Sequence, residues 1–135
     1  AAPFVIDVSQ IRLLTGHPHA AVRCSSVEAL AVTAKKGDDL STALLVQLTK
    51  DDDGDVRWSA LRALGHIALK GDVAVKAAMC ECVDDPDEQV RVAAVENLSN
   101  IADKGDEEAV RLLRRCLKDA SSPDFQREVL RTMLA

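Results

Sequence analysis

The stretch Val56–Asp72, VRWSALRALGHIALKGD, occurs in three related copies at a constant spacing in this 135-residue chain. The other two copies are VRCSSVEALAVTAKKGD at Val22–Asp38 and VRVAAVENLSNIADKGD at Val90–Asp106. Each copy begins with Val-Arg and ends with Lys-Gly-Asp, and each starts 34 residues after the one before it. A fixed period of this length is typical of stacked structural repeats, none of which can bury its apolar face alone.

Apolar residues recur within each copy at the spacing of one face of a helix. In the central copy they are Val56, Ala60, Leu61, Leu64 and Ile67. Steps of three and four residues match the helical period of about 3.6 residues, whereas a strand would alternate. Aromatic residues make up only 2% of the chain, so small and branched aliphatic side chains must fill the core. The sequence therefore predicts an all-α protein.

Each copy supplies the second helix of a pair, and the segment between two copies supplies the first helix of the next pair. The Lys-Gly-Asp motif is predicted to be the hinge between pairs. Its lysine would face the negative end of a helix dipole, its glycine would take the left-handed C′ conformation, and its aspartate would cap the next helix. The helices placed on this basis span residues 4–15, 19–36, 39–50, 73–83, 107–118 and 123–134, together with the equivalents of 19–36 in the second and third copies.

Paired helices, an Asp-Pro type of turn and the motif V-R-x-x-A-x-x-x-L starting at Val56 resemble HEAT repeats, particularly the short HEAT-like repeats of phycobilin lyases. Tetratricopeptide repeats share the period, but their large aromatic positions are missing, as is the Thr-Pro-Leu-His signature of ankyrin repeats. The resemblance implies an all-α, right-handed α–α superhelix of armadillo-like type with about four helix pairs. We expect one domain over residues 1–135, with repeats at about 4–36, 38–70, 72–104 and 106–135.

The same resemblance implies a ladder of aspartate and arginine side chains along the stack. The first repeat departs from the pattern because His17 stands at the aspartate position, and the last departs because Gln126 stands at the arginine position. The matching residues are Arg23, Arg57, Arg91, Asp51, Asp85 and Asp119.

In this family the second helices line the concave face, so their outward positions would form a binding surface. Trp58, Arg62, His66 and Leu69 fall on one helical stripe, and Trp and Arg are the residues most enriched at binding hot spots. Alternatively, Trp58 packs on a neighbouring helix and Arg62 pairs with Glu28 or Glu96 across the groove. The predicted partner-binding residues are Trp58, Arg62, His66, Leu69, Glu28, Val92, Glu96 and Asn100; the same columns also contain Cys24 and Val32.

Two short patterns superficially suggest metal ligands. The run from Asp51 to Asp55 resembles the start of a calcium loop but lacks the glycine and glutamate that such a loop needs further on, so helix capping is the expected role. His17-Pro18-His19 is expected to end one helix and begin the next. Cys82 and Cys116 occupy a core position of the repeat, and Cys80 points to another face. We predict no metal, no cofactor and no catalytic residue.

Charge placement limits the partners. The net charge is −5, and most acidic residues fall at predicted turns, which argues against nucleic acid as a partner. Arg111, Arg114, Arg115 and Lys118 form a basic stripe on the helix predicted at 107–118, where Glu107 and Glu108 are spaced to pair with Arg111. We interpret this stripe as a solvated face, with an acidic partner as the alternative. The chain has neither a secretory signal pattern nor an apolar run long enough to span a membrane, which predicts a soluble cytoplasmic protein.

These observations favour a non-enzymatic scaffold that binds a segment of a protein or peptide along the concave face of the second helices. One alternative is a lyase or chaperone subunit of the phycobilin-lyase type. Another is a purely structural segment of a longer HEAT array. The chain is expected to be a monomer or a part of such an array.

Overall fold

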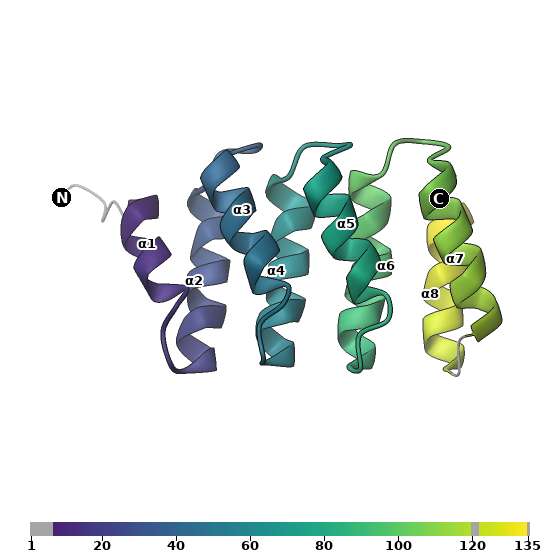
Figure 1. The fold of residues 1–135 in the computed structure, drawn as a ribbon, viewed down its shortest axis with the longest axis horizontal. Helices are drawn as coiled ribbons and strands as arrows, with labels where there is room; N and C mark the ends of the chain where they lie inside the picture. The colour runs from purple at the N-terminus through teal and green to yellow at the C-terminus, as the bar shows by residue number, and fades with distance from the viewer. Residues whose placement is uncertain (1–6, 120–121, 135) are drawn as a thin grey trace.

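The computed structural model describes residues 7–119 and 122–134. This part of the chain contains eight α-helices and no strand. They are α1 (Val8–Leu14), α2 (Ala20–Thr33), α3 (Asp39–Leu48), α4 (Gly54–Ile67), α5 (Val73–Cys82), α6 (Glu88–Ile101), α7 (Glu107–Asp119) and α8 (Pro123–Leu134). Figure 1 shows two layers, with the odd-numbered helices in front and the even-numbered helices behind. The predicted all-α superhelical repeat fold is confirmed.

The core lies between the two layers and between successive even-numbered helices. Helix α4 packs against α3, and also against α2 and α6 on its two sides. From the apolar column predicted in the central copy, Val56, Ala60, Leu61 and Leu64 are fully buried. Burial of one such large aliphatic side chain contributes about 1.5–3 kcal/mol. This repeated column therefore holds neighbouring repeats together.

The Lys-Gly-Asp motif confirms two parts of the sequence prediction and corrects a third. Gly37 and Gly71 have positive φ angles of 82° and 83°, and Asp38 caps α3 through the N–H of Ser41 at 2.9 Å. However, α2 ends at Thr33 and not near residue 36, because Ala34 already has an extended backbone with ψ of 141°. The glycine therefore lies three residues beyond the C-cap, in a turn of its own.

That glycine turn caps the neighbouring repeat. The Gly37 N–H donates to the carbonyl of Ile67, the last residue of α4, at 2.6 Å. The Gly71 N–H makes the same contact with Ile101, the last residue of α6, at 2.7 Å. A C-terminal helix carbonyl has no partner within its own helix. The hinge glycines thus satisfy carbonyls across the repeat boundary, which the sequence prediction did not include.

A second glycine sets how closely α4 and α6 approach. A Cβ atom added to Gly65 would lie 2.0 Å from Oδ1 of Asn97, a distance that no side chain can adopt. Asn97 is itself buried and donates to the carbonyl of Ala93 at 2.8 Å. Gly65 therefore allows a buried amide to fit between the two helices.

Helix α1 differs in its described bounds from the helix predicted at 4–15. Helix α1 begins at Val8, with Asp7 as its N-cap, while residues 4–6 of the helix predicted at 4–15 lie outside the described residues. Ile11 is buried, but Leu14 is 46% exposed although it aligns with the buried Leu48. In the described part of the chain, a neighbouring repeat covers only one side of α1, which explains the difference.

Candidate functional site

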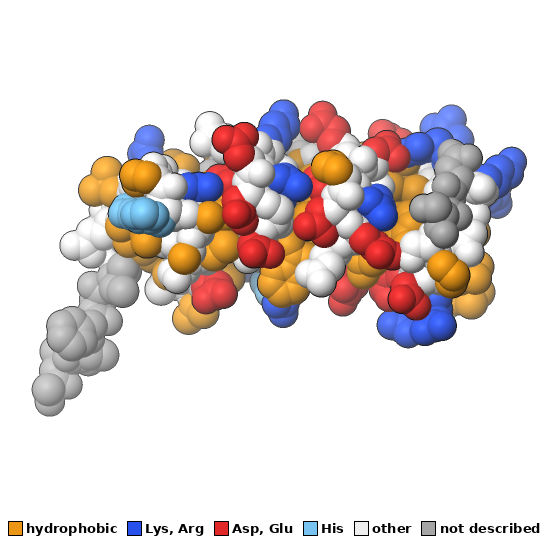
Figure 2. All heavy atoms as spheres, turned by 90° about the horizontal axis from the view of Figure 1, so that it is seen from below, with side chains coloured by type: hydrophobic (Ala, Val, Ile, Leu, Met, Phe, Trp, Pro, Cys, Tyr) orange, Lys and Arg blue, Asp and Glu red, His pale blue; other side chains and the backbone are white. Residues whose placement is uncertain are grey.

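The turns within the repeats form an edge of alternating charges, which Figure 2 shows from below the view of Figure 1. Arg23 donates from Nε and Nη2 to the two carboxylate oxygens of Asp51, both at 2.9 Å. Its Nη1 donates to the carbonyls of His17 and Pro18 in its own turn, at 2.8 and 3.0 Å. One guanidinium thus binds the turn of its own repeat and the aspartate of the next repeat.

The second repeat reproduces this arrangement almost atom for atom. Arg57 donates to the two carboxylate oxygens of Asp85 at 2.9 and 3.0 Å, and to the carbonyls of Asp51 and Asp52 at 2.9 and 3.1 Å. The Arg57 and Asp85 side chains are only 15% and 9% exposed. Paired, fork-like hydrogen bonds between ions are stronger than neutral ones and fix geometry. We therefore interpret these ladder residues as structural.

The ionised form of the ladder carboxylate is stabilised. Burial would raise the pKa of Asp51, but the hydrogen bonds from Arg23 and from the N–H of Asp53 outweigh it, so the pKa lies below its ordinary value. Asp51 consequently stays charged at neutral pH.

The two ends of the ladder differ from its middle. Arg91 donates to the carbonyls of Asp85 and Pro86 at 2.7 and 3.1 Å, while the side chain of Asp119 lies outside the described residues. At the other end, Nδ1 of His17 accepts the N–H of His19 at 3.1 Å, as the Asp51 carboxylate accepts the N–H of Asp53. His17 thus closes its turn as an aspartate would, without a negative charge.

The predicted partner-binding columns lie on the same three helices, α2, α4 and α6. At the first outward position, Trp58 on α4 is half-buried, as are its equivalents Cys24 on α2 and Val92 on α6. The next two positions are exposed in all three helices. Those exposed residues are Glu28, Arg62, Glu96, Val32, His66 and Asn100.

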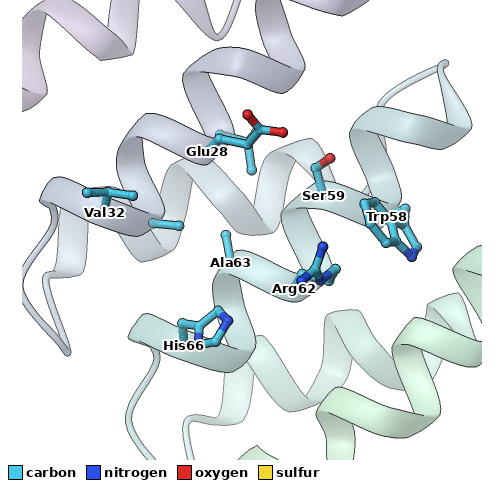
Figure 3. A pocket seen from close by; sticks show the side chains of 9 residues that line it. Glu28, Val32, Trp58, Ser59, Arg62, Ala63 and His66 are labelled. Carbon is cyan, nitrogen blue, oxygen red and sulfur yellow. The ribbon is translucent and has the colours of Figure 1, made fainter.

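A pocket of about 230 Å³, open to solvent, lies between α2 and α4 on this face (Figure 3). Small side chains at Ala31 and Ala63 leave room between the larger ones, and Val32 at the rim is 85% exposed. Four of the predicted partner-binding residues line it: Glu28, Trp58, Arg62 and His66. Val32, which the same predicted columns contain, lines it as well. The sequence prediction did not include the other four lining residues, which are Val27, Ala31, Ser59 and Ala63.

Arg62 stacks on Trp58 instead of forming an ion pair. Its guanidinium carbon lies 4.7 Å from the centroid of the indole ring, and Figure 3 shows the two side chains together at one side of the pocket. Among the described residues, no carboxylate lies within 4.0 Å of the Arg62 guanidinium, so the alternative pairing with Glu28 or Glu96 is not what the structure shows. A cation over an indole face is attracted by the ring electrons.

The other predicted residues lie outside this pocket. Leu69 covers the Gly37 turn, where a glycine Cβ would come within 2.9 Å of its Cγ, and it remains 55% exposed. Val92 and Glu96 lie on α6, one repeat further along the stack. Asn100 lines a separate cavity of about 630 Å³ between α6, α7 and α8.

The remaining polar patterns have structural partners. Asp53 caps α4 through the N–H groups of Asp55 and Val56 at 2.9 and 3.2 Å, which confirms the predicted capping role. Cys82 and Cys116 are core residues, also as predicted. Burial raises the pKa of Cys82 to about 11, which keeps its thiol protonated.

The basic stripe of α7 makes contacts other than those predicted. Glu108 lies 3.3 Å from Lys76 of α5, which also contacts Asp106 at 3.0 Å, and no pair with Arg111 is seen among the described residues. Arg115 contacts Asp84 at 2.9 Å in an exposed ion pair. Charged residues of α7 therefore pair with oppositely charged residues of the neighbouring repeat.

Comparisons with known proteins place these features in context. A family model described as HEAT repeats matches residues 10–99, and one described as PBS lyase HEAT-like repeat matches residues 90–119. No match was found among curated protein sequences. No helix in the described part of the chain is long and apolar enough to cross a bilayer.

Many solved structures are similar in fold, and the following three are among them. The complex of CpcE and CpcF of phycocyanin lyase from Nostoc aligns with a TM-score of 0.75 and 20% identity over 93% of this chain and 79% of that one. A designed armadillo repeat protein in complex with a (KR)4 peptide gives 0.71 and 19% over 94% and 63%. An engineered protein gives 0.67 and 22% over 94% and 61%. At these identities the likeness concerns the fold.

Proposed function

Because the chain belongs to the HEAT-repeat family, we propose that it is a non-enzymatic interaction module that holds a segment of a protein partner against its concave face. The pocket between α2 and α4 carries this proposal. It lies where the exposed face of the repeat departs most from its siblings, with Trp58 and Arg62 in place of Cys24 and Glu28. Trp and Arg are among the residues most enriched at the hot spots of protein interfaces.

The size of the pocket supports a side chain as its occupant. Its volume of about 230 Å³ is below the range of about 300–1,000 Å³ that is usual for whole small-molecule ligands. A partner segment that inserts one apolar side chain and extends along the neighbouring helices would match this shape. The designed armadillo protein bound to a peptide has a similar fold, which supports a groove-binding role.

Affinity capture from cells that express the protein tests the proposal. We expect Trp58→Ala to lower partner recovery at least about tenfold, as removal of a hot-spot aromatic does. Val73→Ala, which truncates an exposed apolar side chain on α5 in the other layer, is the control and should lose much less. Equal recovery with wild type and Trp58→Ala would contradict the proposal.

A second candidate function is a lyase or chaperone role of the phycobilin-lyase type. The PBS lyase HEAT-like match at residues 90–119 overlaps most of the lining of the cavity of about 630 Å³, which falls within the usual range for small-molecule sites. The visible absorbance of an added bilin would then shift when the bilin binds to the protein. Asn100→Leu should reduce that shift, whereas Trp58→Ala should not.

A third candidate, a purely structural segment of an array, predicts neither saturable capture of a partner nor a change in bilin absorbance.

A further inference from the structure

The state of Arg62 indicates which partner chemistry the groove selects. The guanidinium groups of Arg23 and Arg57 are hydrogen-bonded to ladder aspartates. Arg62, in contrast, is exposed and stacked on Trp58, and it has no ion-pair partner among the described residues. Stacking leaves the planar edge of a guanidinium free to bind a carboxylate through two hydrogen bonds. Arg62 is therefore preorganised for an acidic group.

The same stacking disfavours a basic partner residue at this point. Arg62 already covers a face of the Trp58 ring, the position that a lysine or arginine of a partner would otherwise take. Such a residue would also meet the positive charge of Arg62 at close range. The second repeat thus discriminates between charges, and it favours a carboxylate.

The neighbouring repeats carry the opposite charge at the same position. Glu28 on α2 and Glu96 on α6 are both exposed and flank Arg62 along the concave face. The complementary partner therefore has a basic, an acidic and a basic residue in that order. The order reads the same in both directions, so these charges leave the chain direction of the partner open.

Helix spacing converts that order into a sequence pattern. Packed helices lie about 8–10 Å apart, and α2, α4 and α6 pack against one another in succession. A polyproline II segment advances about 9 Å per turn of about three residues and places every third side chain on the same side. A partner in this conformation would meet one charged column with every third residue.

Resting on the proposed function, we propose that the concave face binds an extended segment with the pattern basic-x-x-acidic-x-x-basic. The central carboxylate binds Arg62, the outer basic residues face Glu28 and Glu96, and an apolar residue beside the carboxylate enters the pocket that Ala31 and Ala63 leave open. The apolar residue belongs between the acidic residue and the basic residue that faces Glu28, because the pocket lies between α2 and α4 (Figure 3).

Three peptides test the pattern. The probe is acetyl-Lys-Pro-Leu-Glu-Pro-Ala-Lys-amide. The second peptide has Gln in place of Glu, and the third, acetyl-Lys-Pro-Leu-Lys-Pro-Ala-Glu-amide, has the probe's composition in another order. Binding is followed by the fluorescence of Trp58, the only tryptophan of the chain, and by the anisotropy of a dye on the peptide. The protein is used as wild type, Arg62→Gln and the control Arg114→Gln, an exposed arginine on α7.

We expect the probe to bind wild type on the order of tenfold more tightly than either of the other peptides, since a paired carboxylate is replaced or misplaced. Arg62→Gln should abolish the preference for Glu over Gln, and Arg114→Gln should retain it. Circular dichroism should be unchanged in both variants, because both side chains are exposed.

Three outcomes would overturn this inference alone. If the three peptides bind equally well, or if Arg62→Gln keeps the preference for Glu, a groove exists but the charge pattern is wrong. If no peptide binds at millimolar concentration, the pattern is also wrong, and capture through Trp58 then decides the proposed function separately. If Arg114→Gln no longer binds the probe and Arg62→Gln still does, the peptide binds at α7 in the layer of odd-numbered helices, and both proposals fail.

Discussion

The ladder edge and the concave face are built on the same three helices, α2, α4 and α6. The ladder residues are the same from repeat to repeat, whereas the residues of the concave face differ. At the ladder, Arg23 and Arg57 make the same set of hydrogen bonds with distances that agree within 0.1 Å. On the concave face, the equivalent of Trp58 is a cysteine in one repeat and a valine in the other. Residues that repeat hold the stack together, and residues that differ form the pocket.

The largest expected effect comes from breaking one rung of the ladder. Asp85→Asn removes the charge that holds the Arg57 guanidinium in a mostly buried site, and we expect a loss of about 2–4 kcal/mol in the free energy of unfolding. The neighbouring change Asp84→Asn removes only the exposed pair with Arg115 and should cost less than about 1 kcal/mol. Urea unfolding measures both. Equal losses would show that the ladder is no more than a surface feature.

A somewhat smaller effect is expected between α4 and α6. Gly65→Ala forces a methyl group against Asn97, and overpacking of this kind costs about 1–3 kcal/mol. Alanine's better helix propensity offsets about 1 kcal/mol of that cost. The double variant with Asn97→Ala should be less destabilised than the sum of the two single variants. Strict additivity would mean that the two residues do not touch.

Acid should weaken the ladder before the apolar core. The pKa of Asp51 is lower in the folded chain than its ordinary value, so its ion pair contributes stability at neutral pH and loses that contribution as the pH falls through the folded pKa. We expect the midpoint temperature of thermal unfolding to decrease at pH values below about 4. Asp51→Asn should make this midpoint less dependent on pH. Asp52→Asn, an exposed neighbour, is the control. An unchanged dependence in Asp51→Asn would contradict the assignment.

Much of the fold could be predicted because a repeat displays the same constraint several times. The columns at Val56 and Leu64, the left-handed glycines and the aspartate caps each follow from local rules. The contact of Gly37 with Ile67 could not be predicted, since it joins two repeats through backbone atoms that carry no sequence signal. The same holds for Gly65 against Asn97, which depends on the distance between helices.

The candidate site was predicted only in part for a similar reason. Trp58 and Arg62 could be identified because they differ from the residues at the same positions of the other repeats, but their stacking depends on side-chain rotamers. The pocket also depends on small side chains, which no sequence motif marks. Ala31 and Ala63 could have been found by asking which small side chains lie beside Trp58 on adjacent helices. Whether these residues bind a partner stays a prediction.

One pair of variants on α4 tests the division between the two faces most directly. Arg57→Gln and Arg62→Gln make the same chemical change on one helix, the first at the ladder and the second at the pocket. Each variant is measured by urea unfolding and by affinity for the Lys-Pro-Leu-Glu-Pro-Ala-Lys peptide, at a temperature where both are folded. We expect Arg57→Gln to lose stability and keep its affinity, and Arg62→Gln to keep its stability and lose affinity about tenfold. A division of roles between ladder and pocket would be contradicted if Arg62→Gln lost as much stability as Arg57→Gln, or if it bound the peptide as tightly as wild type.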